Sequence, residues 1–319
     1  MNELLKNISK IGIVPVIVLN DASKAAKVAK ALLDGGIDCA EVTFRTDAAE
    51  ESIRNISAAY PDMLLGAGTV LTAEQVDRAV VAGAKFIVTP GYNPEVVNYC
   101  VEKGVPVVPG CMDTNAIEMA LAAGLDTVKF FPAEQAGGVK MLKALAGPYV
   151  NIHFMPTGGV NKDNLLEYLS FDKVVACGGS WMVKKDLIEN ERFDEITKLA
   201  KEAVMAMLNF RVVHVGINND SEEDADKQVK LLSSLFGFEE DVKSASTFAS
   251  DRIEVCRKRF PGVHGHIAIG TSSCERAMYF LSKSGVEFDI ETAKYKGDKL
   301  TSVYLKEQIG GFAFHLVTK

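Results

Sequence analysis

The sequence predicts an α/β protein, a (β/α)8 TIM barrel followed by a smaller α+β domain. Three observations predict this class. Eight short apolar runs alternate with amphipathic stretches, several of these stretches end at glycine, and beyond residue 209 the pattern changes to two similar modules. Regular alternation of strands and helices is typical of a parallel barrel. We therefore expect a barrel over residues 1–209 and a second domain over residues 210–319.

The apolar runs of the first domain have the length and near-continuous apolar character of buried parallel strands. They cover residues 12–19, 39–44, 64–68, 86–89, 105–109, 127–131, 153–156 and 173–177. The helices expected around them include 23–33, 72–82, 94–102, 114–123 and a closing helix at 193–208. No GxGxxG motif follows the first strand, which disfavours the competing open, doubly wound sheet.

The second domain contains an internal repeat of two βα-plus-strands modules. His214-Val-Gly-Ile and His266-Ile-Ala-Ile each start such a module. We expect strands at 211–217 and 266–269, and helices at 225–236 and 274–284. The second module ends in strands 300–306 and 311–317. The first has only residues 253–255 to match them, so we expect it to be short by about one strand.

Composition and charge exclude several classes of protein. The 319 residues are 48% hydrophobic and 24% charged with a net charge of −7, which is typical of a globular chain without the basic field that nucleic acid or an anionic membrane needs. No apolar run reaches the roughly 18–20 residues of a membrane span. The six cysteines form no CxxC pair, and residues 1–10 do not form a secretory signal. We therefore expect reduced, mostly buried thiols in a cytoplasmic protein.

Strand alternation predicts a charged pair inside the barrel. Glu41, Thr43 and Arg45 share the face opposite the apolar one, and the alternation in the sixth strand places Lys129 inside near Glu41. A buried ion pair of purely structural role is one interpretation, and a lysine lying outside between the helices is another. The functional interpretation is a desolvated, nucleophilic Lys129 with Glu41 as its acid or base.

Two glycine-rich segments follow the seventh and eighth strands, where barrels commonly bind phosphate. They are Thr157-Gly158-Gly159-Val160 and Gly178-Gly179-Ser180. Glycine lets backbone N–H groups approach an anion closely. The two segments therefore predict a phosphate site, and tight turns without a ligand are the alternative.

Six motifs that occur in order closely resemble the 2-keto-3-deoxy-6-phosphogluconate/4-hydroxy-2-oxoglutarate aldolase family. They are Glu41-Val-Thr-Phe-Arg45-Thr, Gly66-Ala-Gly-Thr69-Val, Thr89-Pro90-Gly91, Lys129-Phe-Phe-Pro-Ala-Glu134, Pro156-Thr-Gly-Gly-Val160 and Gly178-Gly-Ser180-Trp181. The resemblance runs from about residue 11 to residue 204. It departs at Phe44, where a leucine is familiar, on the outward face of the strand.

The resemblance implies a class I aldolase that needs no metal or other cofactor. Lys129 would form a Schiff base with a 2-keto acid, and Glu41 would be the general base. The implied binding residues are Arg45 and Thr69 for the pyruvyl carboxylate, Pro90 and Phe131 around the imine, and Thr157, Gly158, Gly159 and Ser180 for phosphate. The substrate would be a phosphorylated 2-keto-3-deoxy acid cleaved to pyruvate and glyceraldehyde 3-phosphate. A homotrimer is also implied.

Residues 212–317 resemble the vicinal-oxygen-chelate (glyoxalase/bleomycin-resistance) superfamily. By position, its metal ligands would be His214, Glu254, His266 and His315, a set that suits Fe(II), Mn(II), Ni(II) or Zn(II). His315 stands where a glutamate is usual. A degenerate module kept for packing or oligomerisation is the alternative interpretation.

Three functional hypotheses remain open at this point. The first is the Schiff-base aldolase, and the second is a barrel isomerase or decarboxylase that uses Lys129 and Glu41 without a covalent adduct. In the third, the C-terminal domain is a metal-dependent glyoxalase- or dioxygenase-like enzyme, or a small-ligand sensor that regulates the aldolase. For the aldolase, the phosphogluconate-type acid, its C4 epimer and 4-hydroxy-2-oxoglutarate are candidate substrates. The glycine segments favour the phosphorylated pair.

Overall fold

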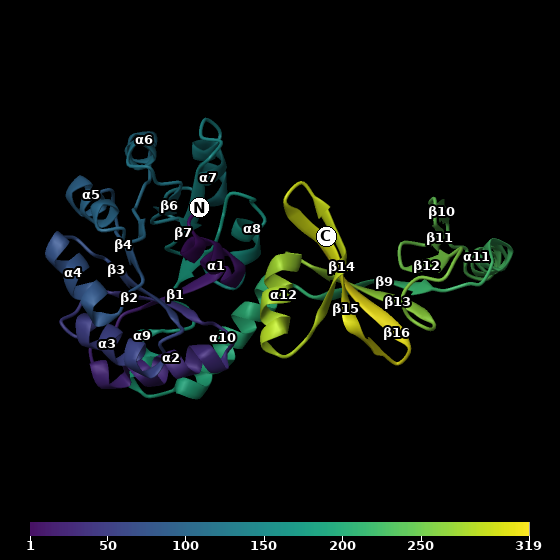
Figure 1. Cartoon of the computed structure of the whole chain (residues 1–319), viewed down its shortest axis with the longest axis horizontal. Helices are drawn as coiled ribbons and strands as arrows, with labels where there is room; N and C mark the ends of the chain where they lie inside the picture. The colour runs from purple at the N-terminus through teal and green to yellow at the C-terminus, as the bar shows by residue number, and fades with distance from the viewer. Residues whose placement is uncertain (319) are drawn as a thin grey trace. The chain divides into compact units, whose positions relative to one another are not determined.

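The computed structural model describes residues 1–318 and divides into two compact units, Met1–Met207 and the chain from Leu208 onward (Figure 1). Each unit is described by itself. No helix in the described part of the chain combines the length and the apolar character that a membrane crossing requires.

The first unit is a parallel barrel. Its strands are β1 (Ile13–Ile17), β2 (Cys39–Thr43), β3 (Leu64–Gly68), β4 (Phe86–Val88), β5 (Val107–Val108), β6 (Thr127–Phe130), β7 (His153–Pro156) and β8 (Cys177–Gly179). Six pair in the order β5-β4-β3-β2-β1-β8, and β6 pairs with β7. Parallel bridges Gly110–Lys129 and Thr157–Gly178 join the two groups, so the barrel closes as the sequence predicts.

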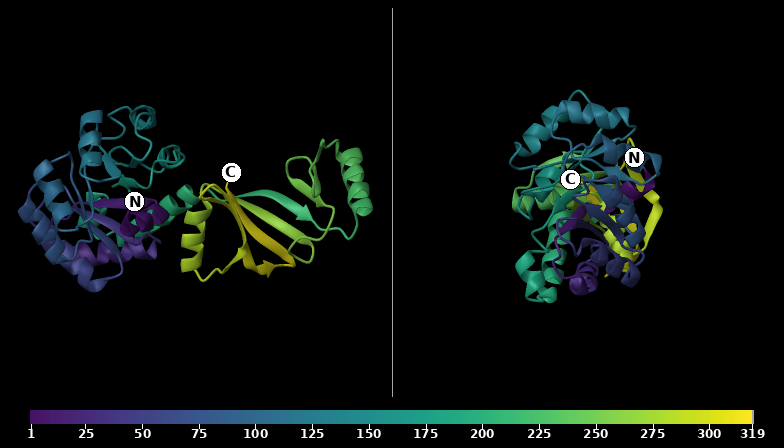
Figure 2. Two further views of the ribbon diagram at one scale, coloured as in Figure 1. Left: turned by 45° about the horizontal axis from the view of Figure 1, so that its top comes forward. Right: turned by 90° about the vertical axis from the view of Figure 1, so that its left-hand side faces the viewer.

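Helices surround these strands (Figures 1 and 2). They are α1 (Glu3–Ile11), α2 (Ala25–Asp34), α3 (Ala49–Ala59), α4 (Ala73–Ala82), α5 (Pro94–Glu102), α6 (Thr114–Ala122), α7 (Gly138–Ala146), α8 (Leu165–Leu169), α9 (Lys185–Glu189) and α10 (Phe193–Leu208), with a short 3-10 helix at Ala22–Lys24. Helix α1 is absent from the sequence prediction. The Asn2 side chain caps its start, left-handed Gly12 ends it, and Leu5 and Ile8 are buried.

Two strands differ from the predicted ranges for physical reasons. β5 has two residues instead of five, because Pro106 and Pro109 flank it and lack the N–H that a ladder needs. β8 includes Gly178 and Gly179, so these two residues are not a turn. A Cβ on Gly178 would lie 2.3 Å from Thr157 Oγ1, and one on Gly179 would lie 1.8 Å from the Trp181 ring. These glycines therefore allow close packing within a strand.

The second unit contains one eight-stranded sheet in the order β10-β11-β12-β9-β13-β16-β15-β14. Its first module comprises β9 (Arg211–Ile217), α11 (Glu222–Phe236), β10 (Glu240–Val242), β11 (Ser246–Ala249) and β12 (Ile253–Cys256). Its second module comprises β13 (Gly265–Thr271), α12 (Cys274–Lys283), β14 (Phe288–Lys296), β15 (Lys299–Ile309) and β16 (Phe312–Thr318). Figure 1 shows α11 and α12 toward opposite ends of this unit.

The two modules have the same βαβββ order, so the expectation that the first is short by one strand is wrong. The sequence prediction did not include β10, β11 or β14. The β10 residues Glu-Asp-Val are all exposed and lie at the edge of the sheet, so they lack the apolar alternation that marks a half-buried strand.

Candidate active site and metal centre

Lys129 on β6 and Glu41 on β2 meet inside the barrel. Lys129 Nζ lies 3.2 Å from Glu41 Oε1, and the two side chains are only 5% and 1% exposed. The interpretation that Lys129 lies between the outer helices is therefore wrong. Glu41 Oε2 is buried and has no hydrogen-bond partner within residues 1–318. A buried carboxylate oxygen without a partner is costly, so it is ready to accept a proton or hydrogen bond from a ligand.

The local sequence makes room for this pair. Glu41 stands beside Gly66 of β3 in the sheet register, and Gly68 follows on the same strand. A Cβ on Gly68 would lie 2.0 Å from Glu41 Oε1, so only glycine leaves space for the carboxylate. On the other side, Lys129 Nζ lies 5.4 Å from the centre of the Phe131 ring. The amine is thus enclosed by a carboxylate and an aromatic face.

Arg45 and Thr69 follow the carboxyl ends of β2 and β3. Arg45 Nε donates a hydrogen bond to Thr69 Oγ1 at 3.2 Å, and Arg45 is exposed. Thr69 has a φ of +55°, a left-handed conformation that is strained for a β-branched residue. The hydrogen bond to Thr69 uses one N–H group of the Arg45 guanidinium, which has further N–H donors in one plane. This planar arrangement can bind a carboxylate through two hydrogen bonds.

Pro90 follows β4 and is half-buried. A Cβ on Gly110 would lie 2.2 Å from the Pro90 carbonyl oxygen, so the segments after β4 and β5 approach each other closely. The Thr89 hydroxyl donates to the Gly91 carbonyl oxygen at 2.6 Å. These contacts fix the backbone at Pro90 on the rim of the barrel.

Gly158 and Gly159 form a turn after β7, next to buried Thr157. Their φ values are +97° and +80°, a region that favours glycine. No hydrogen-bond acceptor in residues 1–318 is assigned to the Gly159 N–H. Ser180, directly after β8, is exposed at the neighbouring strand end. The turn and Ser180 thus offer polar groups at the same end of the barrel as Lys129.

Sequence reasoning missed Tyr168 and gave no role to Glu134. The Tyr168 hydroxyl donates a hydrogen bond to Glu134 Oε1, and the Tyr168 side chain is fully buried. Burial and the Glu134 carboxylate raise the pKa of Tyr168. The Glu134 N–H donates to the Gly158 carbonyl oxygen at 3.0 Å. Glu134 therefore connects α8 to the glycine turn. The only sequence signal was its place in the Lys129–Glu134 motif.

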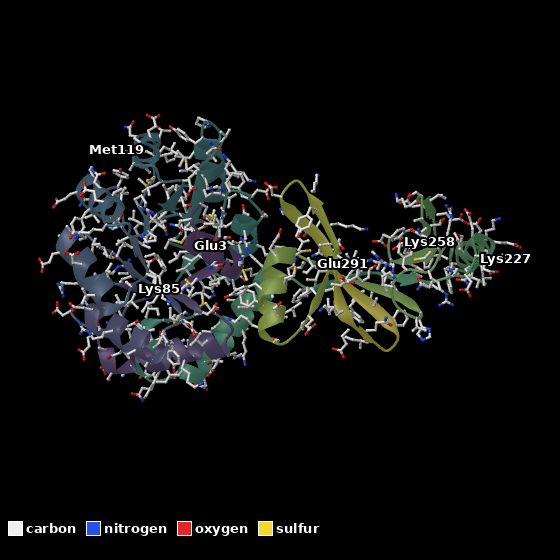
Figure 3. The ribbon with its side chains drawn as sticks, viewed as in Figure 1. Glu3, Lys85, Met119, Lys227, Lys258 and Glu291 are labelled. Atoms are coloured by element: carbon white, nitrogen blue, oxygen red, sulfur yellow. The ribbon has the colours of Figure 1, made fainter. Side chains whose placement is uncertain are left out.

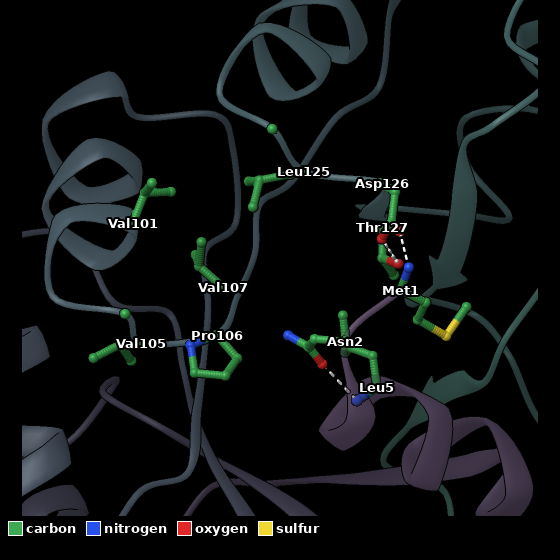
Figure 4. A pocket seen from close by; sticks show the side chains of 12 residues that line it. Met1, Asn2, Leu5, Val101, Val105, Pro106, Val107, Leu125, Asp126 and Thr127 are labelled. Atoms are coloured by element: carbon green, nitrogen blue, oxygen red, sulfur yellow. Dashed lines mark hydrogen bonds and ion pairs between the residues drawn. The ribbon is translucent and has the colours of Figure 1, made fainter.

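A separate pocket of about 340 Å³ lies at the opposite end of the strands. Asn2, Leu5, Pro106, Leu125 and Asp126 are among the residues that line it, and Asp126 pairs with the amino group of Met1 (Figure 4). The lining residues come from the start of the chain with α1 and from the amino-terminal ends of β5 and β6 with the segments before them. Barrel enzymes use the carboxyl ends of their strands, so this pocket is not the candidate active site.

The four predicted metal ligands of the second unit converge. His214 Nε2 lies 3.1 Å from His266 Nε2 and 3.2 Å from Glu254 Oε2, which is 3.1 Å from His266 Nε2. Two donor atoms that bind one ion at right angles, each at about 2.1 Å, lie about 3.0 Å apart. The His315 ring centre lies 5.2 Å from that of His266. This donor set fits one divalent transition metal.

Unpartnered and charged groups in the cluster also fit a metal. His315 Nε2 is buried without a hydrogen-bond partner within residues 1–318, while its Nδ1 lies 3.1 Å from Ser302 Oγ. Burial, with the neighbouring histidines, lowers the pKa of His315 to about 3 and keeps it in the neutral form that binds metals. Burial opposes ionisation of Glu254, but hydrogen bonds from His214, His266 and Ser246 outweigh it and hold its pKa well below the usual range.

The internal repeat is reproduced in the register of the sheet. Residues that pair in register across neighbouring strands form two equivalent rows. The first row consists of Phe248, Glu254, Gly216 and His266, and the second consists of Tyr304, His315, Ala268 and His214. Each row has an aromatic ring, a ligand, a small residue and a histidine. A Cβ on Gly216 would lie 2.1 Å from the His266 ring, so the small residue makes room for the histidine. Sequence reasoning named the four converging residues as candidate ligands but missed Tyr304 and Ser302.

The fold and the barrel site define an enzyme that carries a buried lysine–carboxylate pair at the carboxyl ends of parallel strands. The model of the "KDPG and KHG aldolase" family matches residues 4–199, more than half of the chain. The chain therefore belongs to the KDPG and KHG aldolase family, a family of aldehyde-lyases. The second unit lies beyond the matched residues.

Known relatives agree with this assignment. The 2-dehydro-3-deoxy-phosphogluconate aldolase of Haemophilus influenzae is 48% identical over 202 residues, which cover 63% of this chain and 95% of that protein. The KHG/KDPG aldolase of Escherichia coli K12 is 42% identical over 192 residues, 60% of this chain and 90% of that protein. A crystal structure of the KDPG aldolase of Legionella pneumophila, "with pyruvate captured at low pH as a covalent carbinolamine intermediate", has 37% identity and a TM-score of 0.61. It covers 62% of this chain and 97% of its own.

Proposed function

We propose that the barrel is a class I aldolase that cleaves 2-keto-3-deoxy-6-phosphogluconate into pyruvate and glyceraldehyde 3-phosphate. The observation that carries this proposal is the buried contact of 3.2 Å between Lys129 Nζ and Glu41 Oε1. A nucleophile beside an acid/base group is the minimum that Schiff-base chemistry requires. The substrate follows the names of the Haemophilus and Escherichia relatives.

Lys129 Nζ adds to the C2 ketone, and loss of water gives a protonated imine. Glu41 takes the proton from the C4 hydroxyl, directly or through water. The C3–C4 electron pair then moves toward the imine nitrogen and glyceraldehyde 3-phosphate leaves. The remaining enamine takes a proton at C3, and water releases pyruvate from Lys129. No step needs a metal or another cofactor, so chelation should leave this activity intact.

The rest of the site orients the substrate. The Arg45 fork and the Thr69 hydroxyl, joined by their hydrogen bond, hold the carboxylate next to C2. Pro90 and Phe131 surround the imine. The phosphate binds at the other side of the mouth, to Thr157, Gly158, Gly159 and Ser180, where glycine backbones offer N–H groups without obstructing side chains.

The name of the Escherichia relative supports a second substrate, 4-hydroxy-2-oxoglutarate, which would yield pyruvate and glyoxylate. Cleavage of both acids, followed by pyruvate release, tests the proposal. We expect the phosphorylated acid to be cleaved with the higher kcat/KM and Lys129→Ala to abolish both activities. An unchanged activity in Lys129→Ala would favour a lyase or isomerase mechanism without a covalent adduct.

We further propose that the protein acts as a cytoplasmic homotrimer. Exposed apolar side chains gather on successive loops and α6, with Leu71, Met112 and Met119 51%, 49% and 43% exposed. The Tyr92 hydroxyl donates to the Met119 carbonyl oxygen and Asn93 donates to that of Leu71, which ties these segments together. Figure 3 shows Met119 on the outer side of the barrel.

Such a surface suits a closed oligomer, and the family resemblance supports three copies. Sedimentation should therefore give three times the 34.5 kDa of one chain. A monomer or dimer mass would contradict the trimer. The six free, buried cysteines support a reducing compartment.

For the second unit we propose a divalent transition-metal centre formed by His214, Glu254, His266 and His315. A bound ion would supply Lewis acidity for a small oxygen ligand. The Ser302 contact orients His315, and Ser246 orients Glu254. Metal analysis of the purified protein tests this centre. We expect about one ion per chain, lost in a His214→Ala/His266→Ala double variant, whereas unchanged metal content in that variant would exclude the ligand set.

A further inference from the structure

Cys256 lies beside the proposed metal centre of the second unit and has no role in it so far. It is fully buried and follows Glu254 by two residues on β12, so both side chains leave the same face of the strand. Ligand atoms of Glu254, Cys256 and His266 all lie within 4.8 Å of one another. A second such group consists of His214, His266 and His315. The two groups share His266, which joins them into one cluster.

A hydrogen bond from Ser246 orients the Glu254 carboxylate toward Cys256. Ser246 is the register partner of Cys256 on β11, and its hydroxyl donates to Glu254 Oε1 at 2.5 Å. Glu254 Oε2 at the same time contacts His214 and His266. One oxygen of the Glu254 carboxylate thus contacts Ser246, the register partner of Cys256, and the other contacts His214 and His266.

Two further observations indicate that the cluster is completed by a ligand. His315 Nε2 is buried and has no hydrogen-bond partner within residues 1–318, and His315 is more than nine-tenths buried. Tyr304 stacks on His315 with 4.7 Å between the ring centres, and its ring centre lies 6.3 Å from that of His266. The histidines are thus enclosed by an aromatic side chain.

We propose that Cys256 is a further ligand of this centre and that its thiolate selects a soft or borderline ion, Zn(II), over harder ions such as Mn(II). Imidazole and carboxylate ligands bind many divalent metals, whereas a thiolate favours the softer ones. On binding, the S–H bond breaks, a sulfur–metal bond forms and the proton passes to solvent, with no change in oxidation state. The inference rests on the metal centre proposed above.

Titration of the full chain with Co(II) alone tests this inference. Thiolate bound to Co(II) gives a near-ultraviolet charge-transfer absorption that imidazole and carboxylate ligands do not give. We expect this band in the wild-type protein and expect Cys256→Ser to lose it while still binding Co(II). We also expect that variant to lose roughly 10-fold or more in Zn(II) affinity and much less in Mn(II) affinity.

Cys274→Ser is the matched control, because Cys274 is another buried cysteine of the same unit and contacts Thr318 rather than the cluster. It should keep the band. Circular dichroism verifies the fold of each variant, and Cys256→Ala provides a second substitution if Cys256→Ser does not fold.

Each other outcome overturns a specific statement. Co(II) bound to the wild type without the band shows that Cys256 is not a ligand, while the metal centre stands. A band that survives Cys256→Ser, or that Cys274→Ser removes, assigns the thiolate elsewhere. No Co(II) or Zn(II) binding by the wild type overturns the metal centre itself.

Discussion

The Tyr168 hydroxyl donates a hydrogen bond to Glu134, and the Glu134 backbone in turn holds the glycine turn after β7. A Cβ on Gly159 would lie 2.5 Å from Glu134 Cγ, so this glutamate determines how close the turn can approach. The hydrogen bond from Tyr168 thus acts on the glycine turn, where the phosphate is proposed to bind. Its contribution should therefore depend on the phosphate and not on the cleavage chemistry.

We expect Tyr168→Phe to raise KM for the phosphorylated acid about fivefold and to leave kcat nearly unchanged. Losing a hydrogen bond to a charged group costs about 1.5–3 kcal/mol. We expect about 1 kcal/mol of this loss to appear as weaker binding of the phosphorylated substrate. KM for 4-hydroxy-2-oxoglutarate, which lacks a phosphate, should not change. Steady-state kinetics with both substrates checks this. An equal loss for both would instead indicate a general structural role.

Gly159→Ala should weaken phosphate binding and destabilise the barrel by more than backbone strain alone. Gly159 and Gly124 both have a φ of +80°, but a Cβ on Gly124 meets nothing within 4 Å. Gly124→Ala therefore measures the cost of the left-handed conformation, about 1–2 kcal/mol. Urea unfolding of both variants isolates the clash with Glu134. Equal stabilities and unchanged KM would show that the turn tolerates a side chain.

Glu41→Gln should lower kcat by roughly 10²–10⁴-fold, because it removes the base and keeps the shape of the side chain. The Lys129 amine remains in place in this variant. The exchange of C3 protons of pyruvate with solvent deuterium, followed by NMR, should slow in parallel with cleavage, since both need the same proton transfers. A variant that cleaves at the wild-type rate would show that another group is the base.

The barrel thiols should resist modification near neutral pH. Burial raises the pKa of Cys100 to about 11 and that of Cys111 to about 12. A thiol is protonated below its pKa, so at pH 8 only about one molecule in 10³ or fewer carries the reactive thiolate at these positions. Labelling with a disulfide reagent should be slow at pH 8, faster toward pH 11, and complete at all six cysteines after unfolding. Rapid labelling of either residue in the folded protein at pH 8 would contradict their burial.

Removal of metal should distinguish the chemistry of the barrel from that of the second unit. We expect dialysis against EDTA to leave aldolase activity unchanged, because the proposed Schiff-base chemistry of Lys129 and Glu41 needs no ion. We expect the same treatment to remove metal from the proposed His214–His266 centre. Activity assays and metal analysis on one sample check both statements. Loss of cleavage after chelation, restored by a divalent ion, would contradict the Schiff-base mechanism.

Strand alternation was sufficient to predict much of the barrel. A period of two placed Glu41 and Lys129 on inward faces, and a closed barrel brings inward faces together whatever the details of the loops. The repeat of His214 and His266 likewise predicted their meeting, since equivalent strands pair at the centre of the sheet.

What the sequence did not reveal depends on tertiary contacts. Strand β10 is exposed along its length and therefore carries no apolar pattern. Gly178 and Gly179 resemble a turn in the sequence, and only the packing of Thr157 and Trp181 explains them within a strand. Tyr168 contacts Glu134, which is far from it in the sequence, so no local spacing marks it. Cys256 follows Glu254 by two residues, but its closeness to His266, on another strand, is a tertiary contact.

Reduction with borohydride in the presence of pyruvate tests the central claim most directly. Peptide mass spectrometry of the treated wild-type protein should find one pyruvyl adduct, on Lys129, and Lys129→Ala should show neither the adduct nor cleavage. A protein that cleaves its substrate yet forms no adduct, or that carries the adduct on another lysine, would contradict the account.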